Sequence, residues 1–437
     1  MVIIASKVRV RNEEEIPIIH EKPKPKKCDD DCYYVISLAL AKLGLIMMYF
    51  FICDRTTLFM NESKYFSFVT FLVLLGIVMA LGLLFTSNSR HTTLLHRDQT
   101  DEWKGWMQLI ILIYHITGAS KILPIYMHIR VLVAAYLFLS GYGHFSFFWN
   151  KGTYEFHRVF QVLFRLNLLT VCLCFTMNRS YQHYYFVPLI SFWFLVICAT
   201  MAVWPRATAT PAEANSRQYM YVTVKLVILI MAVSGMFLTS AATEKIFLLP
   251  PIRTLFVLGK NSVREWMFRL QLDRYSAIYG MIFAFCCALL KKLKVLTDSE
   301  ENMLFSKCIS CFVTVLSVFG IFSYAILVSF CHTKEECNRI HPYITFVPIL
   351  SFILLRNTFY VIRRKYSAAF AWVGKISLEL FITQYHVWLS ADSKGVLVLI
   401  PGQPLLNFMT TTYIFVCLSH EIHTVTGTLA KHVIRNN

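Results

Sequence analysis

Charged residues are scarce in this sequence, and acidic residues are the scarcer of the two signs. Asp, Glu, Lys and Arg together make up 15% of the 437 residues, whereas an ordinary soluble domain contains about 25%. Polar intervals between the apolar runs are also short, and none reaches the roughly 50 residues of the smallest common domains. We therefore expect neither a soluble globular protein nor a separate soluble domain.

Signatures of several other classes are missing as well. Most of the 13 cysteines lie inside apolar runs, so they do not form the disulfide framework of a small secreted domain. The net charge of +17 is not carried by a basic helix with interleaved aromatic residues, so we expect no nucleic-acid partner. Cys308 and Cys311 have no matching second pair, and "SHEIH" at 419–423 is not an H-E-x-x-H motif. We therefore expect no metal.

The N-terminal segment lacks the apolar core and the small-residue cleavage site of a signal peptide. Its proline and lysine content predicts a basic, extended tether over residues 1–33. Apolar runs of about 20 residues then recur along the chain, and each can cross a hydrocarbon core of about 30 Å as a helix. We predict an all-α polytopic bundle over 34–430 with about 10–13 transmembrane segments that contact membrane lipid. The predicted segments are 34–53, 66–86, 106–123, 128–148, 158–177, 184–204, 220–241, 276–290, 308–330, 341–356, 370–390 and 405–425.

Residues 242–275 are predicted to differ from the other segments. Pro250 and Pro251 break a helix, so we expect a bent or re-entrant piece followed by an interfacial amphipathic helix at "REWMFRLQLDRY". Counting Lys and Arg on alternate loops favours a cytoplasmic N-terminus, because cytoplasmic loops are enriched in these residues. Under that count the glycosylation sequons at Asn61 and Asn178 fall on the same side.

Two cysteine pairs are spaced closely enough to close a disulfide in an oxidising compartment, namely Cys28 with Cys32 and Cys331 with Cys337. The sequence leaves free thiols equally open for both pairs.

One stretch, "HRDQTDEWKGWMQLIILIYHITGAS", places polar side chains inside an apolar segment. At about 100° per residue, one stripe of a helix contains Asp101, Lys104, Gln108 and His115, and it spans about 16 Å from Lys104 to His115. A charge at the membrane centre costs about 2.5–3.5 kcal/mol, so such groups face a cavity or a partner. His115 is therefore either a functional residue or a neutral imidazole that is hydrogen-bonded to a neighbouring helix.

Other segments repeat this placement of polar groups. "KISLELFITQYH" at 375–386 puts a lysine, Glu379 and His386 at the same offsets as Lys104, Gln108 and His115, and we expect Glu379 and His386 opposite His115. Arginines that face a bundle interior suit a phosphorylated or carboxylated ligand. Further polar residues expected in the interior are Arg130, Arg158, Arg165, His420, Glu421 and His423.

Together these residues favour an interior site that handles an anionic substrate. Imidazole serves as a general base or an acyl acceptor, so His115 is the predicted catalytic group. Lys104, Asp101 and Gln108 are predicted to orient it or to bind donor phosphates. A transporter that moves an anion without chemistry is the alternative.

The stretch that carries His115, with "RVLVAAYLFLSGYGHFSFFW", "YYFVPLISFWF" and "GKISLELFITQYHVWLSADSKGVLVLIPG", resembles the membrane domain of the capsule O-acetylation (Cas1-type) acyltransferase family. The resemblance covers about residues 34–425 and implies an acyltransferase that 9-O-acetylates sialic acid, as animal members do. The pattern is more distantly similar to bacterial acyltransferases of the acyltransferase-3 type, in which a membrane histidine follows a basic residue by one helix span. This similarity implies catalytic roles for Lys104 and His115.

The resemblance also implies acetyl-CoA as the donor on the cytosolic side, and sialic acid, free or CMP-linked, as the luminal acceptor in the Golgi. It places the residues before 34 in the lumen, against the charge count. Family members carry a luminal SGNH-hydrolase-like domain with a Ser–Asp–His triad and a G-D-S motif, and this sequence has neither. We therefore expect a module that passes acetyl to a luminal SGNH-type domain in trans, or an inactive partner of a longer enzyme.

Overall fold

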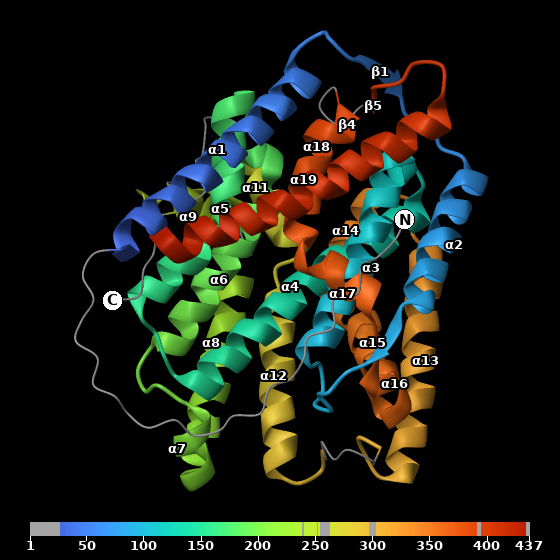
Figure 1. Cartoon of the computed structure of the whole chain (residues 1–437). Helices are drawn as coiled ribbons and strands as arrows, with labels where there is room; N and C mark the ends of the chain where they lie inside the picture. The colour runs from blue at the N-terminus through green and yellow to red at the C-terminus, as the bar shows by residue number, and fades with distance from the viewer. Residues whose placement is uncertain are drawn as a thin grey trace, which may run out of the picture.

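The computed structural model describes residues 27–237, 240–250, 252–253, 263–296, 303–390 and 395–433, and helices make up most of this part of the chain (Figure 1). The first half contains α1 (Lys27–Arg55), α2 (Phe68–Leu84), α3 (Arg97–Ile116), η1 (Ala119–Lys121), α4 (Leu123–Lys151), α5 (Phe156–Met177), η2 (Tyr181–Tyr184), α6 (Phe186–Ala202), α7 (Ala209–Ala214) and α8 (Arg217–Met236). The second half contains α9 (Ser240–Phe247), α11 (Val263–Leu272), α12 (Ser276–Lys292), α13 (Lys307–Ser329), α14 (Lys334–Ile344), α15 (Phe346–Thr358), α16 (Tyr360–Arg364), α17 (Ala368–Lys375), α18 (Ser377–Val387) and α19 (Pro404–Val433).

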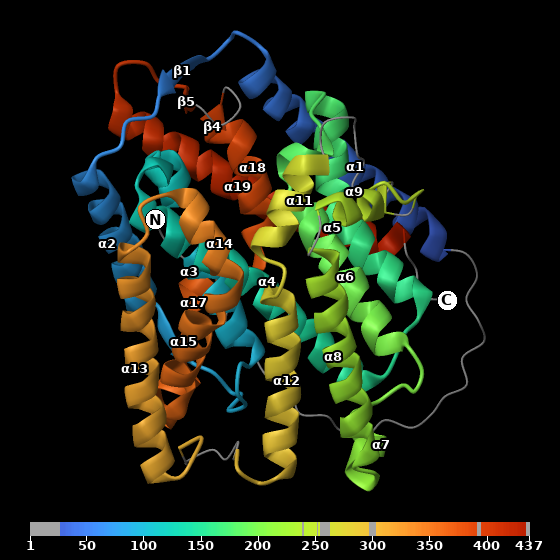
Figure 2. The ribbon, with the colours of Figure 1, turned by 180° about the vertical axis from the view of Figure 1, so that it is seen from behind.

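The predicted polytopic helical bundle is confirmed. In the described ranges, 6 helices are long and apolar enough to cross a membrane, or up to 7 if the bent pair α14 and α15 forms one span. The six candidate spans are α1, α4, α5, α8, α11 together with α12, and α13. Figure 2 shows α13, α15 and α17 on one side of the bundle and α5, α6 and α8 on the other, with α4 and α12 between them.

Several predicted segments have different ends in the structure. The segment predicted at 106–123 begins at Arg97 and stops at Ile116, because Gly118 adopts a left-handed conformation with φ of 65° that ends the helix. The segment predicted at 370–390 is divided at Ile376 into α17 and α18. The segment predicted at 341–356 belongs to the bent pair, whose two helices meet at 52°. Helix α11 begins at Val263, one residue before the predicted amphipathic stretch, and by length and composition it belongs with α12 to one candidate span and not to a separate interfacial helix.

Two small antiparallel sheets join connections that are distant in the sequence, and neither was predicted. Strand β1 (Met60–Ser63) pairs with β5 (Gly395–Val398), with Met60 opposite Val398, and β5 also pairs with β4 (Leu389–Ser390). Strand β2 (Thr86–Asn88) pairs with β3 (Lys365–Ser367), with Thr86 opposite Ser367. Each sheet ties a connection in the first quarter of the chain to one in the last quarter.

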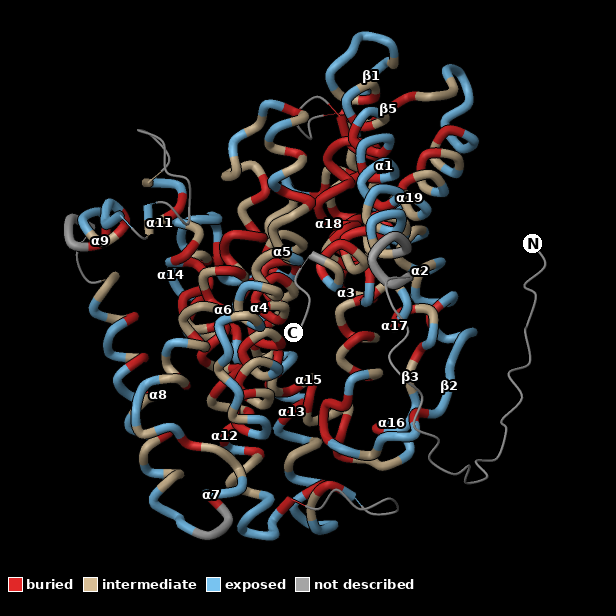
Figure 3. Tube along the Cα trace, turned by 60° about the vertical axis from the view of Figure 1, so that its left-hand side comes forward, coloured by how far each residue is buried: buried red, intermediate tan, exposed pale blue. Residues whose placement is uncertain are grey.

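The two sheets lie towards different ends of the molecule, with β1 and β5 at the top of Figure 3 and β2 and β3 well below them. We call the end with β1, β5 and η2 the Asn61 end, because Asn61 lies in β1. We call the end with β2, β3 and α16 the Lys104 end, because Lys104 lies in the half of α3 nearer to it. Between the ends, α18 is almost completely buried, as the red tube in Figure 3 shows.

Helices α3 and α17 pack with their backbones in contact. A Cβ atom added to Gly105 would lie 1.8 Å from the carbonyl oxygen of Phe370, and one added to Gly374 would lie 1.8 Å from the carbonyl oxygen of Asp101. Only glycine allows two helices to approach this closely, as in small-residue contacts between membrane helices. This contact fixes the position of Lys104 relative to the start of α18.

Candidate functional site

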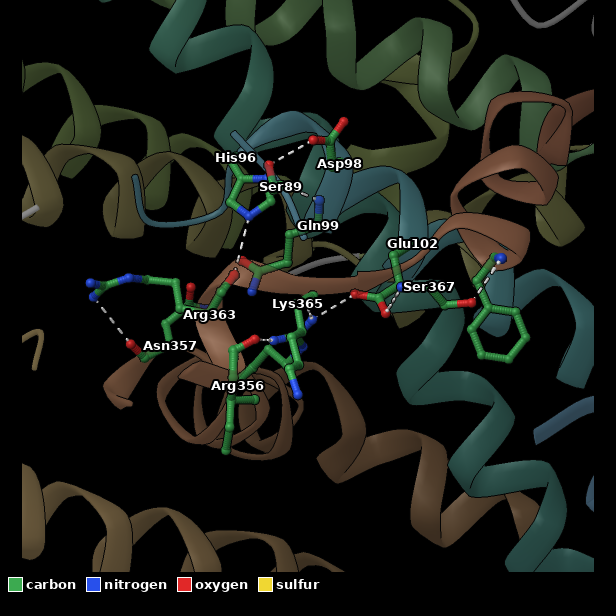
Figure 4. Close-up of polar contacts among 12 residues, drawn as sticks. Ser89, His96, Asp98, Gln99, Glu102, Arg356, Asn357, Arg363, Lys365 and Ser367 are labelled. Atoms are coloured by element: carbon green, nitrogen blue, oxygen red, sulfur yellow. Dashed lines mark hydrogen bonds and ion pairs between the residues drawn. The ribbon is translucent and has the colours of Figure 1, made fainter. Parts of the chain in front are cut away.

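The charged residues at the start of α3 mainly anchor the helix at the Lys104 end (Figure 4). Asp98 accepts a hydrogen bond of 2.7 Å from the Ser89 hydroxyl. The Glu102 carboxylate accepts one of 2.8 Å from the Arg356 guanidinium and one of 2.7 Å from the Ser367 amide. This network joins α3 to the connection between α15 and α17, so its acidic residues are structural.

The imidazole of His96 caps the first turn of α3. Its Nδ1 accepts a hydrogen bond of 3.3 Å from the Gln99 amide, and its Nε2 lies 3.3 Å from the carbonyl oxygen of Arg363. Burial lowers the pKa of His96, so the ring is neutral at physiological pH and can accept from the amide.

A cavity of about 550 Å³ at this end has Lys291, Lys292 and Asn150 in its lining and lies on the opposite face of α4 from Lys104. The Lys292 ammonium donates to the Ala212 carbonyl and the Ser216 hydroxyl at 3.1 and 2.9 Å. This lysine therefore fastens the connection between α7 and α8.

A second cavity, of about 450 Å³, opens beside Lys104 between α3, α4, α5, α6 and α18, and we call it the transfer cavity. Its polar lining residues are Lys104, Gln108, Tyr136, Ser140, His144, Arg158 and Ser377. Two residues of the predicted α3 stripe, Lys104 and Gln108, therefore line this cavity, and so does the predicted Arg158. Asp101 lies behind it, 2.9 Å from the Lys104 ammonium.

The transfer cavity favours an anionic ligand. Lys104 and Arg158 are its charged lining groups, and none of the described residues that line it is acidic. The first two residues of α18, Ser377 and Leu378, also line it, and the first turn of a helix leaves backbone N–H groups without intrahelical acceptors. A helix N-terminus attracts negative charge, so its effect adds to that of the two cations.

His115 lies beyond the transfer cavity, two turns of α3 farther towards the Asn61 end. Its ring is half-buried and contacts the rings of Tyr114 and Tyr385, with centroids 5.1 and 6.3 Å away. Phe381, which lines the cavity, packs against Tyr385 at 5.8 Å. His115 is therefore not a lining residue of the cavity, and a row of aromatic rings joins the two.

Beyond Tyr385 a second group of polar residues meets at the Asn61 end. The Nδ1 of His386 donates a hydrogen bond of 2.9 Å to the carboxylate of Asp54, and its Nε2 lies 2.5 Å from the Tyr184 hydroxyl. The neighbouring His183 ring lies 5.3 Å from Tyr385 and 6.4 Å from His386. The structure therefore pairs His386 with Asp54, 332 residues away.

Glu379 belongs to a different group of side chains. The Nδ1 of His423 donates to its carboxylate at 3.0 Å, and the guanidinium of Arg165 lies 3.2 Å from the His423 ring. This series of contacts leads from the interior to the surface, because Glu379 is buried while Arg165 is exposed on α5. It connects α18, α19 and α5 away from the transfer cavity.

The remaining predicted site residues have their own partners. Arg130 forms an ion pair with the buried Asp273, whose other oxygen lies 3.5 Å from the His341 ring. Glu421 pairs with Lys42 at 2.6 Å on the outer side of α19. The exposed His420 lies against the ring of Trp372, with centroids 5.6 Å apart.

Within the described ranges, the cysteines and the sequons show no further site. Cys331 and Cys337 are both free thiols, as is Cys32, and the side chain of Cys28 lies outside the described residues. Asn178 ends α5, and its carbonyl oxygen lies 3.4 Å from the Arg55 guanidinium at the end of α1. In the described part of the chain, no group of three or more His, Cys, Asp or Glu side chains is placed to hold a metal ion.

Four residues near the candidate site, His144, Asp54, His183 and Tyr184, were not predicted, and their signals in the sequence are weak. His144 lies in "SGYGHFSFFW", where it is a histidine in the middle of a membrane segment, as His115 is. Asp54 ends the first apolar run at "FFICDR", where an acidic residue is also expected simply at a membrane interface. His183 and Tyr184 lie in a short connection, so no helical periodicity indicates which way they face.

Comparison with known proteins gives the site its context. The chain matches, over residues 1–437, the family described as the 10 TM acyl transferase domain found in Cas1p. It is 51% identical over 397 residues to the N-acetylneuraminate (7)9-O-acetyltransferase of Danio rerio. The matched region covers 91% of this chain and 50% of that protein. The chain thus spans about half the length of this relative. No solved structure matches it. The chain therefore belongs to the family of ten-span membrane acyl transferase domains found in Cas1p.

Proposed function

We propose that this chain is an O-acetyltransferase domain that passes the acetyl group of acetyl-CoA across the Golgi membrane to sialic acid, at the 9-hydroxyl of N-acetylneuraminate. The observation that carries the proposal is the arrangement of the transfer cavity and His115. A cationic cavity ends at a row of aromatic rings, and a histidine lies on the far side of that row. The Danio rerio relative, whose name states this acceptor, supports the choice of sugar.

The donor would bind from the Lys104 end. Lys104, Arg158 and the start of α18 would attract its phosphates, and the pantetheine arm would extend along α18 past Phe381. CoA carries several negative charges, which are costly to move through the membrane, whereas an acetyl group is small and neutral. Acetyl can therefore travel past Tyr385 while CoA stays behind.

We assign the Lys104 end to the cytosol and the Asn61 end to the lumen. The basic runs "KKLK" at 291–294 and "RRK" at 363–365 both fall at the Lys104 end, as the enrichment of cytoplasmic loops in Lys and Arg requires. Helix α1 ends at the Asn61 end, so its start faces the cytosol. The two glycosylation sequons would then face the lumen, where glycans are added.

His115 would act as an acyl acceptor. Its imidazole nitrogen attacks the thioester carbonyl, the carbon–sulfur bond breaks, and the ring proton passes to the departing thiolate. The products are free CoA and a neutral acetylimidazole. Transfer to a sugar hydroxyl follows in this chain, or on a luminal SGNH-type domain supplied in trans.

The decisive experiment expresses this chain alone in cells that lack the longer enzyme, and stains the cells for O-acetylated sialic acid. We expect staining with the wild-type chain and none with His115→Ala, with both proteins inserted in the membrane at equal levels. Full staining with His115→Ala refutes the role of His115. Staining that appears only when a luminal domain is supplied indicates transfer in trans.

Labelled acetyl-CoA separates acetyl transfer from transport. Purified protein in vesicles should release CoA outside while labelled acetyl appears on the protein or on the sugar. Intact acetyl-CoA inside the vesicles would instead identify an anion transporter. No label on either side would identify an inactive partner.

A further inference from the structure

Two histidines face Tyr385 from different elements. His115 on α3 has its ring centroid 6.3 Å from that of Tyr385, and His183 on η2 lies 5.3 Å from the same ring. Both histidine side chains are half-buried, whereas Tyr385 is 8% exposed. An acceptor sugar that reaches Tyr385 from the lumen would therefore lie near two imidazoles. His115 already has a proposed role as acetyl acceptor, whereas His183 has none.

His386 fixes the surroundings of His183. Asp54 accepts from the Nδ1 of His386, and the Nε2 of that ring forms a hydrogen bond with the Tyr184 hydroxyl. Both nitrogens of His386 are thus occupied, and its ring is 1% exposed. His386 has no nitrogen left for a substrate.

The ring nitrogens of His183, unlike those of His386, are not occupied by other side chains of the described residues. Among the described residues, no side chain forms a hydrogen bond with its ring, and its backbone amide is held by the Ser180 carbonyl at 2.9 Å. The ring packs at 5.1 Å against Tyr184, which is fully buried. His183 is therefore held in place by its own backbone and by the Asp54–His386–Tyr184 chain, while its nitrogens stay available.

We propose that His183 is the general base of the second half-reaction, the transfer of acetyl from His115 to the acceptor hydroxyl, with Asp54 and His386 as its positioning residues. This inference rests on the proposed function. It adds a catalytic residue and its support at the luminal end of the site.

His183 takes up the acceptor proton and then returns it to His115. The acceptor O–H proton passes to a ring nitrogen of His183 while the acceptor oxygen bonds to the acetyl carbonyl carbon. The bond between that carbon and the His115 nitrogen then breaks. His183 returns the proton to the released nitrogen of His115, so both imidazoles end neutral and the sugar ester leaves. The Asp54 carboxylate, which acts on His183 through its charge, stabilises the transient positive charge on that ring.

The charges around His183 agree with this role. The charged and titratable groups that face it are Asp54 and Arg55 of α1, Arg179 and Tyr184 of the connection before α6, and Tyr385 and His386 of α18. Burial is the main cause that lowers the pKa of His183 to about 4, and His386 and the two arginines act in the same direction, whereas Asp54 raises it. The ring is therefore unprotonated at neutral pH, as a base must be before it accepts a proton.

The test measures the two half-reactions separately on the purified full chain in lipid nanodiscs, with labelled acetyl-CoA as donor and CMP-N-acetylneuraminate as acceptor. We expect His183→Gln to acquire labelled acetyl and release CoA at the wild-type rate, and to transfer acetyl to sugar about 100-fold or more slowly. Asp54→Asn should show a smaller loss in the same half-reaction. His332→Gln, which changes an exposed histidine at the same end, is the matched control and should leave both half-reactions unchanged.

Rescue distinguishes chemistry from folding. Free imidazole added to His183→Ala should restore part of the acetyl transfer to sugar, which a structural role for the side chain does not predict. Wild-type transfer by His183→Gln, or an equal loss of both half-reactions without rescue, overturns the role of His183. A wild-type chain that acquires no acetyl and releases no CoA overturns the proposed function itself, and the role of His183 with it.

Discussion

Replacing Gly374 by alanine should separate α3 from α17 and thereby disable the transfer cavity. The added Cβ would lie 1.8 Å from the carbonyl oxygen of Asp101 and 3.1 Å from the amide nitrogen of Gly105. Unbonded heavy atoms approach to about 3.5 Å, so the two backbones must move apart by roughly 1.5 Å. Neither atom can move alone, because both belong to helical backbone.

The size of the effect follows from this displacement. Overpacking of this kind costs about 1–3 kcal/mol of stability, which leaves a folded protein in many cases. Lys104 moves with α3 and Ser377 with the end of α17, so the opposite walls of the transfer cavity change their spacing. A misplacement of about 1 Å in a catalytic site can lower activity about 100-fold, and we expect a loss of that order in CoA release from acetyl-CoA.

The assay follows CoA release by the purified chain beside its thermal unfolding. Gly105→Ala should behave like Gly374→Ala, because its Cβ would lie 1.8 Å from the carbonyl oxygen of Phe370. Gly76→Ala on α2 is the control, since its added Cβ would have no atom within 4 Å, and alanine favours the helix by about 0.5–1 kcal/mol. A folded Gly374→Ala protein that releases CoA at the wild-type rate refutes the argument that this contact sets the site geometry.

Three further predictions concern other parts of the site. Gly143→Val narrows the transfer cavity at a position where an added Cβ meets no atom within 4 Å, so the KM for acetyl-CoA should rise severalfold in donor titrations while the protein stays folded. Lys64 lies beside Gly118, three residues after His115 in the sequence, and would attract an anionic acceptor to His115. Burial lowers the pKa of Lys64 to about 8, so this residue loses its positive charge as the pH rises through that value. The KM for an anionic acceptor should therefore increase between about pH 7 and 9 in the wild-type chain and stay flat in Lys64→Gln; equal pH profiles contradict a role in acceptor binding. Asn61→Gln and Asn178→Gln should each remove one glycan from protein made in cells, seen as a shift in gel mobility, and a shift in neither case contradicts a luminal Asn61 end.

Apolar run length predicted the helices well, and helical periodicity predicted part of the site. Lys104 and Gln108 lie on one stripe in the sequence and line one cavity in the structure. The parallel drawn with 375–386 fails, because Ile376 interrupts the helix and the residue before it, Lys375, ends α17 on the outside of the bundle. No proline marks that break. The break comes just after Gly374, whose close contact with the backbone of α3 belongs to the tertiary structure.

Partnerships over long sequence distances could not be predicted at all. Glu102 and Arg356 are 254 residues apart, and Asp54 and His386 are 332 apart. A single sequence shows that such side chains need partners in a membrane, because a buried charge is costly, but it does not identify the partners. The acidic residues at the start of α3 show the consequence. Asp101 was predicted to orient His115 or to bind donor phosphates, and in the structure its carboxylate lies 2.9 Å from the Lys104 ammonium, while Asp98 and Glu102 anchor the helix.

Helix α18 explains how one short element can serve both ends of the proposed acetyl path. Its 11 residues extend about 16 Å, half of the hydrocarbon thickness of about 30 Å, so both of its ends lie within the protein interior. Its N-terminus lines the cationic transfer cavity, where a helix dipole favours phosphate or a developing thiolate. Its last turn holds Tyr385 and His386, where the opposite end of the dipole favours a positive imidazole ring. A helix continuous from Ala368 to Val387 would have its N-terminus at Ala368, eight residues before Ile376, and the break at Ile376 is what places a helix N-terminus at the transfer cavity.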